Sequence, residues 1–364
     1  MTAAAGTDFL LRSLFSIFDL PYSSPHLGRT KELTMSTIRP LPILLFVFLS
    51  LLSAVAPDAF SAERPGKPTL LRIGIASRSP LDMPYFVAQQ RGFFREEGLE
   101  TEIILMKAIQ TVQSLLGGSI EFGTATGTAV SAAVSGVDVK VVLALTDRPS
   151  FDLIAQPSIT SVQQLRGKKI GVSAVGSLGE ILARQILIAH QIPPNQVTIL
   201  PLGISQLSYS ALKAGVVDAI MASPPVNYVA QDEGFRKLAA GSEVYRSMQG
   251  GLTTTRAIIS ERPELITKAI RATLRAVRLI KNDRKYGIEF IKGPFLDIGR
   301  ERDRIAERVY DAAVEGYLAS GFVDEKLQRE MITAAAQRIK PPEPVMPERV
   351  FDFSFARKVS ESLR

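Results

Sequence analysis

Three segments of the sequence recur after one common spacing of 97 residues. The pairs are Ile73–Ala76 with Ile170–Ser173, Thr101–Leu105 with Thr198–Leu202, and Leu115–Glu121 with Leu212–Asp218. Strand-like and helix-like stretches alternate through both copies, which is typical of α/β architecture with mainly parallel sheets. We therefore expect two similar lobes in tandem. The alternative is that any two strand–helix–strand units look alike at this level of comparison.

After Gly251 the pattern changes to one strand-like stretch and then helices. The strand-like stretch is Leu252–Ile259, and Pro263 suits the first turn of the helix that follows. Further helices are expected at Asp303–Ala319, Glu325–Ile339 and Phe355–Leu363. Because this part has no set of strands of its own, we expect it to pack on the first lobe. The predicted boundaries are 62–155 for the first part of lobe 1, 156–252 for lobe 2, and 253–364 for the return strand and the C-terminal helices of lobe 1.

Residues 35–61 have the order of charges and apolar residues found in a secretory signal peptide. Arg39 is followed by the apolar stretch Leu41–Leu52 and then by small residues, and cleavage is expected after Ser61. The apolar stretch is short for a membrane span, although an uncleaved anchor remains the alternative. Residues 1–34 are interpreted as a mis-assigned upstream extension.

Composition excludes several classes of chemistry. The chain has no cysteine and two histidines, so disulfides, thiolate metal sites and cysteine nucleophiles are ruled out. His190 ends an apolar helix, and no metal-ligand spacing, phosphate loop or dinucleotide motif accompanies it. We therefore predict no catalytic residues, no metal and no cofactor. The net charge of +7 is spread along the chain, which indicates a solvated surface and no nucleic-acid partner, with a mild bias toward anionic ligands.

Four polar turns follow predicted strands, at residues 77–85, 124–128, 173–178 and 222–227. In open α/β sheets the ligand binds beyond the carboxyl ends of the strands, where helix N-termini offer free N–H groups. The predicted ligand-binding residues are Arg78, Ser79, Met83, Tyr85, Thr124, Thr126, Ser173, Gly176, Ser177, Ser223 and Asn227. Thr126 and Ser223 are 97 residues apart, so their hydroxyls are expected to face each other.

Several of these residues also have a purely structural interpretation. Ser177 and Glu180 have the spacing of a capping box, and Glu180 would disfavour a highly charged anion. The glycine of the third turn, Gly176, can serve only to permit a tight turn. Arg78 can simply be solvated, and the spacing of Phe86 fits a position in the core.

Several motifs resemble the family of ABC-importer solute-binding proteins that includes sulfonate, taurine, nitrate and thiamine-precursor binders. They are Pro84–Glu100 with its aromatic pair before a Gly-Leu, the two similar elements Leu115–Phe122 and Leu212–Ala219, and Val162–Val172. The resemblance covers about residues 70 to 280.

This resemblance implies a two-lobed type II periplasmic-binding-protein fold, with crossing segments near Ala144–Ala155 and Thr253–Ser260. It also implies a monomer in the periplasm that hands a small organic anion or heterocycle to an ABC permease in the inner membrane. Two alternatives remain. One is an enzyme of the same fold, a thiamine-pyrimidine synthase, although its cysteine-rich motif is missing here. The other is a periplasmic ligand sensor.

Overall fold

The structure is a computed structural model that describes residues 68–76, 78–296 and 303–363. The predicted signal peptide, residues 35–61, and the upstream residues 1–34 lie outside the described residues. Across the described ranges, none of the helices has the length and apolar character needed to cross a membrane.

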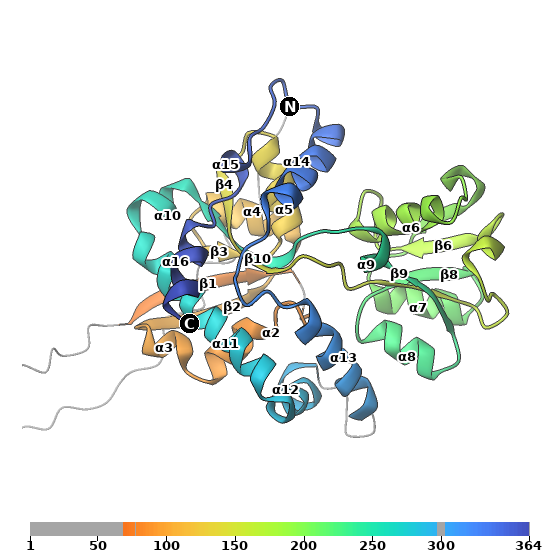
Figure 1. Ribbon diagram of the computed structural model, residues 1–364, viewed down its shortest axis with the longest axis horizontal. Helices are drawn as coiled ribbons and strands as arrows, with labels where there is room; N and C mark the ends of the chain where they lie inside the picture. The colour runs from red at the N-terminus through yellow and green to blue at the C-terminus, as the bar shows by residue number, and fades with distance from the viewer. Residues whose placement is uncertain (1–67, 77, 297–302, 364) are drawn as a thin grey trace, which may run out of the picture. The chain divides into compact units, whose positions relative to one another are not determined.

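Ten strands form two five-stranded sheets in the described residues (Figure 1). The first sheet has the order β2-β1-β3-β10-β4, with β1 Thr69–Ile75, β2 Leu99–Leu105, β3 Phe122–Gly123, β4 Val139–Thr146 and β10 Gln249–Thr255. The second has the order β7-β6-β8-β5-β9, with β5 Asp152–Ala155, β6 Lys169–Val172, β7 Thr198–Pro201, β8 Ala219–Ala222 and β9 Arg236–Ala240. Each sheet with its helices is called a lobe below.

Both sheets are mixed, but four of the five strands of each run in one direction, which agrees with the predicted mainly parallel sheets. The first three strands of each sheet run parallel, whereas β10 and β5 run antiparallel to both of their neighbours. The physical reason is the connection: β10 and β5 follow directly on segments that arrive from the other lobe, without the helical crossover that a parallel neighbour needs.

The register of the strands reproduces the spacing seen in the sequence. Ile73 pairs with Phe122 in the first sheet, and Ile170 pairs with Ala219 in the second. Both residues of one pair are 97 positions from their counterparts in the other pair. The sequence repeat thus marks equivalent positions in two sheets of the same strand order.

Helices cover both faces of each sheet. Those packed with the first sheet are α2 Met83–Gln90, α3 Phe93–Glu96, α4 Ala108–Leu116, α5 Thr126–Val134, α10 Arg256–Glu261, α11 Pro263–Asn282, α12 Arg284–Phe290, α13 Asp303–Gly316, α14 Glu325–Ile339, α15 Pro347–Val350 and α16 Ser354–Ser362. Those of the second sheet are α6 Leu178–Ala189, α7 Ser205–Lys213, α8 Val226–Asp232 and α9 Gly241–Val244. Short 3₁₀ turns lie at Val162–Leu165 and Pro194–Gln196, and a π turn at Ile291–Phe295.

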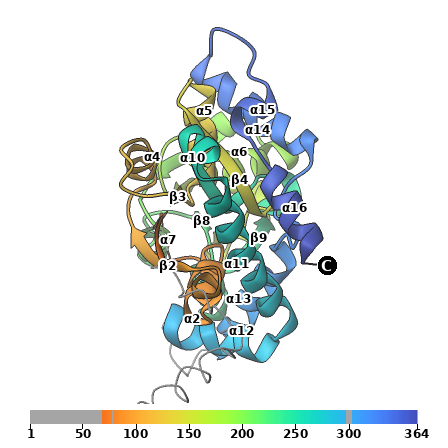
Figure 2. The same cartoon turned by 90° about the vertical axis from the view of Figure 1, so that its left-hand side faces the viewer.

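The C-terminal helices pack on the first lobe, as the sequence predicted. Helix α14 lies against α5, and α16 lies beside α11 and β4 (Figure 2). The segment between α15 and α16 covers the edge strand of the first sheet, because the Asp352 N–H donates to the Val141 carbonyl at 2.9 Å. Helix α13 also reaches the second lobe, because its Arg308 forms an ion pair with Asp232 of α8 at 3.0 Å.

Apolar side chains on alternate strand positions separate the core into layers. In β5, Leu153 packs in the cluster under α6, whereas its neighbour Ile154 packs in the cluster under α7 and α8. On α11 the buried residues form one face that packs against α2 and α3. Each lobe therefore has its own core, and the strand ends are left free to carry polar loops.

The chain crosses between the lobes twice, at residues 147–151 and 245–248. The first crossing agrees with the expected Ala144–Ala155, but the expected second crossing at Thr253–Ser260 is wrong. Those residues finish β10 and begin α10, because the Thr255 hydroxyl accepts a hydrogen bond from the Ile258 N–H and caps that helix.

Hydrogen bonds and an ion pair link the two crossings to each other. The Ser247 N–H donates to the Asp147 carbonyl at 3.2 Å, and the Arg246 guanidinium binds the Asp147 carboxylate at 2.8 Å. Arg246 also binds Asp324, at the start of α14, at 3.0 Å. The connection between the lobes is thus a pair of linked segments rather than two separate ones.

Candidate functional site

A cavity of about 630 Å³ lies between the lobes. Its walls come from the loop before α2, the start of α5, the start of α6, the second crossing and one face of α14. A volume of this size suits a small organic molecule.

Two helix N-termini of the cavity wall come from different lobes. Thr126 is the first residue of α5 and is buried, and Gly127 and Thr128 follow it along the wall. Gly176 and Ser177 precede α6 on the other side. The unpaired N–H groups of a helix start can bind polar atoms of a ligand.

The start of α6 is held by Ser177 and Glu180, as the predicted capping box implies. Ser177 accepts a hydrogen bond from the Glu180 N–H at 3.3 Å. The Glu180 carboxylate accepts from the Gly176 N–H at 2.6 Å, one residue earlier than a standard box would place it. That backbone bond and the Arg184 guanidinium lower the pKa of Glu180. Part of the donor capacity at this helix start is therefore already used by the protein.

A buried carboxyl group, that of Asp82, lies in the wall of the cavity. Asp82 is 5% exposed and occupies the N-cap position of α2, but its side chain makes no capping bond. It instead accepts a hydrogen bond from the Ser79 hydroxyl at 2.9 Å. Burial raises the pKa of Asp82 to about 6, against the smaller opposite effect of hydrogen bonds from Ser79 and Thr124.

A positive charge reaches the same cavity from α14. The Arg338 guanidinium donates to the Gly176 carbonyl at 3.1 Å, across the gap between the lobes, and it lies 3.5 Å from the Ser131 hydroxyl. Its contact with Gly176 joins the C-terminal helices to the start of α6 in the second lobe.

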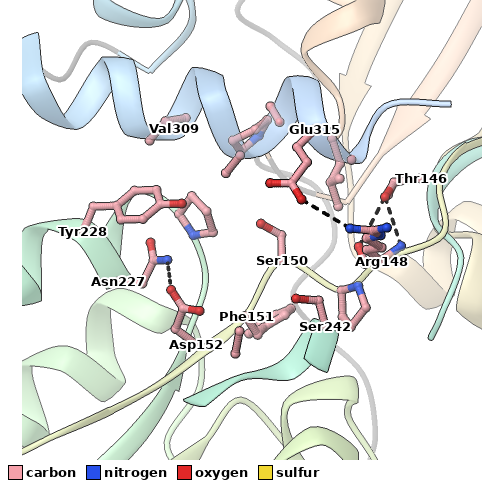
Figure 3. Close-up of a pocket in the computed structure, with 18 of the residues that line it drawn as sticks. Thr146, Arg148, Ser150, Phe151, Asp152, Asn227, Tyr228, Ser242, Val309 and Glu315 are labelled. Carbon is pink, nitrogen blue, oxygen red and sulfur yellow. Dashed lines mark hydrogen bonds and ion pairs between the residues drawn. The ribbon is translucent and has the colours of Figure 1, made fainter. Parts of the chain in front are cut away.

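A smaller cavity of about 190 Å³ lies on the other side of the first crossing (Figure 3). Leu81 and Phe151 line both cavities and therefore stand between them. In the smaller one, Asn227 Nδ2 donates to the Asp152 carboxylate at 2.6 Å, and Lys237 pairs with the same carboxylate at 2.9 Å.

The structure places the predicted site residues in three groups. The first group lines the larger cavity: Ser79, Thr124, Thr126, Gly176 and Ser177. Asn227 alone lines the smaller cavity. The remaining five line neither: Arg78, Met83, Tyr85, Ser173 and Ser223.

Met83 and Tyr85 are fully buried in the core of the first lobe, contrary to the expectation that they point into the cleft. They belong to a hydrophobic cluster that includes residues of β1, β10 and α11, which is why they are covered. The Tyr85 hydroxyl has no hydrogen-bond partner among the described residues; the nearby Gly251 N–H approaches it without reaching hydrogen-bond geometry.

The other three residues have local partners or face solvent. Arg78 stacks over the Phe86 ring, with 5.1 Å from its guanidinium carbon to the ring centroid. Ser223 lies 3.2 Å from the Ser205 hydroxyl within the second lobe, so it does not face Thr126. Ser173 is exposed.

Sequence reasoning missed Asp82 and Arg338, and also the wall residues Phe151 and Tyr245. For Asp82 a signal was present, since an aspartate stood directly before a predicted helix within the first polar turn. Arg338 gave no such signal, because it lies far along the chain on an ordinary amphipathic helix.

Two lobes of equal strand order, joined by two crossings beside a cavity lined by both lobes, define a class of two-lobed ligand-binding folds. Within that class the chain belongs to the NMT1/THI5-like family, whose model matches residues 80–285. The chain is 27% identical over 261 residues to the riboflavin-binding protein RibY of Chloroflexus aurantiacus, covering 68% of this chain and 74% of that protein.

The same family contains enzymes. The chain is 30% identical over 146 residues to the 4-amino-5-hydroxymethyl-2-methylpyrimidine phosphate synthase THI5 of Saccharomyces cerevisiae, covering 39% of this chain and 42% of the synthase. Among solved structures, a sulfonate-binding protein SsuA from Methylobacillus flagellatus superposes with a TM-score of 0.63 at 17% identity. That comparison covers 82% of this chain and 95% of SsuA, and it shows that the fold is that of the periplasmic binding proteins.

Proposed function

We propose that this protein is the solute-binding component of an ABC importer. It captures a small organic molecule in the larger cavity, in the periplasm, and delivers it to a permease of the inner membrane. The observation that carries the proposal is that the cavity wall is built from both lobes, including the starts of α5 and α6. A ligand that contacts both helix starts stabilises the closed arrangement of the lobes, which is what a permease can distinguish from the empty protein.

Non-catalytic binding is favoured over the synthase activity of the enzymes in the family. The match to RibY spans most of both chains, whereas the match to THI5 spans less than half of either. The sequence also has no cysteine, whereas the family resemblance implies a cysteine-rich motif for the enzymes of this fold.

Native mass spectrometry of freshly purified protein tests the proposal. We expect one small molecule to be bound per chain and to be recovered unaltered after incubation. Recovery of a chemically changed molecule would instead support the enzyme. The same experiment on protein recovered from the periplasmic fraction tests the predicted location.

A substitution in the wall tests which cavity is used. Thr126→Val removes a buried hydroxyl from the larger cavity, and we expect the affinity for the co-purified ligand to fall by about 0.5–1.5 kcal/mol. Thr267→Val is the matched control, since Thr267 lies half-buried on α11, outside the wall of either cavity, and its hydroxyl donates to the Pro263 carbonyl. Equal affinities of the two variants, measured by calorimetry, would remove the larger cavity from the proposal.

A further inference from the structure

We infer that Asp82 selects the ligand, and that the ligand presents to it an N–H or NH₂ group at the edge of a nitrogen heterocycle without a negative charge. This inference rests on the proposed function and specifies its ligand class. It is carried by the position of one buried carboxyl group in the cavity wall and by the groups around it.

The hydrogen-bond partners of Asp82 leave part of its accepting capacity unused. An ionised carboxylate has about four acceptor positions and no donor. The Ser79 hydroxyl occupies one, at 2.9 Å, and the Thr124 hydroxyl and the Ser79 N–H also face the group. At least one acceptor position is therefore left for a partner in the cavity. A ligand donor would fill it, whereas a second anion would be repelled.

Asp82 has no counter-charge among the described residues. Within the described ranges no lysine or arginine forms an ion pair with Asp82. The cationic side chain in the described wall of the larger cavity, Arg338, already donates to the Gly176 carbonyl. A sulfonate or nitrate placed in this cavity would meet an unneutralised carboxylate in a poorly solvated space, which is strongly unfavourable.

The remaining wall of the cavity combines polar helix starts with apolar surface. Leu81, Phe151, Tyr245, Met248 and Met331 supply apolar and aromatic surface around the polar helix starts. Aromatic rings and methionine side chains pack well against flat, polarisable ring systems. A ring with a donor edge toward Asp82 and an apolar face toward these residues satisfies both parts of the wall.

The pH dependence of ligand affinity reports on the ionisation of Asp82, because the charges of the surrounding groups do not change between pH 5 and pH 7.5. Tyr85 on α2 and Tyr317 after α13 face Asp82, and burial raises the pKa of both phenols. Arg338 on α14 is the cationic side chain in the described wall of this cavity. At the start of α6, the pKa of Glu180 is lowered. A donor ligand binds the ionised form of Asp82, so its affinity should fall as the pH drops through the pKa of that group.

The experiment is calorimetry with four probes: riboflavin, 4-amino-5-hydroxymethyl-2-methylpyrimidine, ethanesulfonate and nitrate. Wild type, Asp82→Asn and the surface control Asp138→Asn are compared at pH 5 and pH 7.5. Asp138 is exposed and pairs with Arg256 and Arg349, remote from the cavity wall. We expect at least one heterocycle to bind both wild type and Asp138→Asn at pH 7.5. Its affinity for both proteins should be about tenfold lower at pH 5. Asp82→Asn should bind it at least tenfold more weakly at pH 7.5 and show none of this pH effect.

Comparing wild type with Asp82→Asn cancels any ionisation of the probe itself, and circular dichroism shows whether the variant is folded. If Asp82→Asn does not fold, the pH dependence of heterocycle binding to wild type is compared with that of ethanesulfonate and nitrate binding. That comparison then decides whether the inference holds. Tighter binding of ethanesulfonate or nitrate than of both heterocycles overturns the inference, as does tighter heterocycle binding at pH 5, an unaffected Asp82→Asn, or no heterocycle binding at all. These results leave the importer proposal standing as long as native mass spectrometry finds an unaltered bound molecule.

Discussion

Burial of Asp82 should make the empty protein less stable at neutral pH than at acidic pH, and the effect can be calculated. The pKa of this carboxyl rises from 3.8 to about 6 because the folded protein removes it from water. The folded state then holds its proton over a pH range in which the unfolded chain has already lost it. Stability contributed by the protonated group is therefore present at low pH and is lost as the pH rises from about 4 to about 6.

The size of the effect follows from the shift. A difference of one pKa unit corresponds to about 1.4 kcal/mol, so Asp82 should lower the free energy of unfolding by about 2–3 kcal/mol between pH 4 and pH 7.5. Asp82→Asn keeps the size of the side chain and cannot ionise. We expect its free energy of unfolding to rise relative to wild type by this amount over the same pH interval.

Urea unfolding of ligand-free wild type and Asp82→Asn, in half-unit pH steps, measures the difference directly. Its slope with pH should be steepest between pH 4 and pH 6 and flat above pH 7. Two parallel curves would mean that the Asp82 carboxylate is well solvated in the folded protein, and the reasoning from its burial would be refuted. Ligand-free protein is essential, because a bound donor would lower the pKa again.

Three further predictions follow from other parts of the structure. Gly251→Ala should lower the free energy of unfolding by about 3 kcal/mol in urea titrations, because Gly251 has φ +143° and a Cβ there would lie 2.0 Å from the Leu143 carbonyl oxygen; a cost below about 1 kcal/mol would contradict this. Tyr85→Phe removes a buried hydroxyl without a partner among the described residues, so stability should stay the same or rise by about 1 kcal/mol and ligand affinity should not change; weaker ligand binding would return Tyr85 to the site. Glu180→Gln should reduce the free energy of unfolding at pH 7 by about 1 kcal/mol, and this effect should disappear as the pH falls from the usual glutamate value of 4.5 through the lowered pKa of Glu180, since the group stabilises the folded state only while it is ionised; the exposed Glu325→Gln is the control.

The sequence predicted the repeating architecture well because the repeat reflects core packing in both lobes. Buried strand residues recur at the same spacing as the paired positions Ile73–Phe122 and Ile170–Ala219. Helix α14 was predicted with its observed bounds, Glu325–Ile339, since Asp324 caps it and its apolar face is regular. Local patterns of this kind are visible in one sequence.

The strand after Gly251 was predicted too long for a local reason. Thr253–Thr255 and Ile258–Ile259 together form a β-branched run that favours a strand. In the structure the strand ends at Thr255, whose hydroxyl caps α10. Threonine serves both roles, and only the tertiary position decides which one it takes.

The site was predicted less well because it depends on which side chains the core covers. Ser79, Thr124 and Thr126 were predicted from their loops and line the larger cavity. Tyr85 and Met83, from the same region, are buried in a core cluster that includes residues of α11, which begins at Pro263, more than 170 residues further along the chain. No local pattern distinguishes a residue that faces a distant helix from one that faces a cavity.

The linked crossings limit how the two halves of the molecule can move. Because Asp147 binds both Arg246 and Ser247, the two crossing segments should bend together as one unit. Two linked segments of this kind bend easily about one axis but resist twisting about their length. The opening between the two lobes should accordingly widen and narrow by rotation about a single hinge axis. A ligand would then leave through the same opening by which it entered.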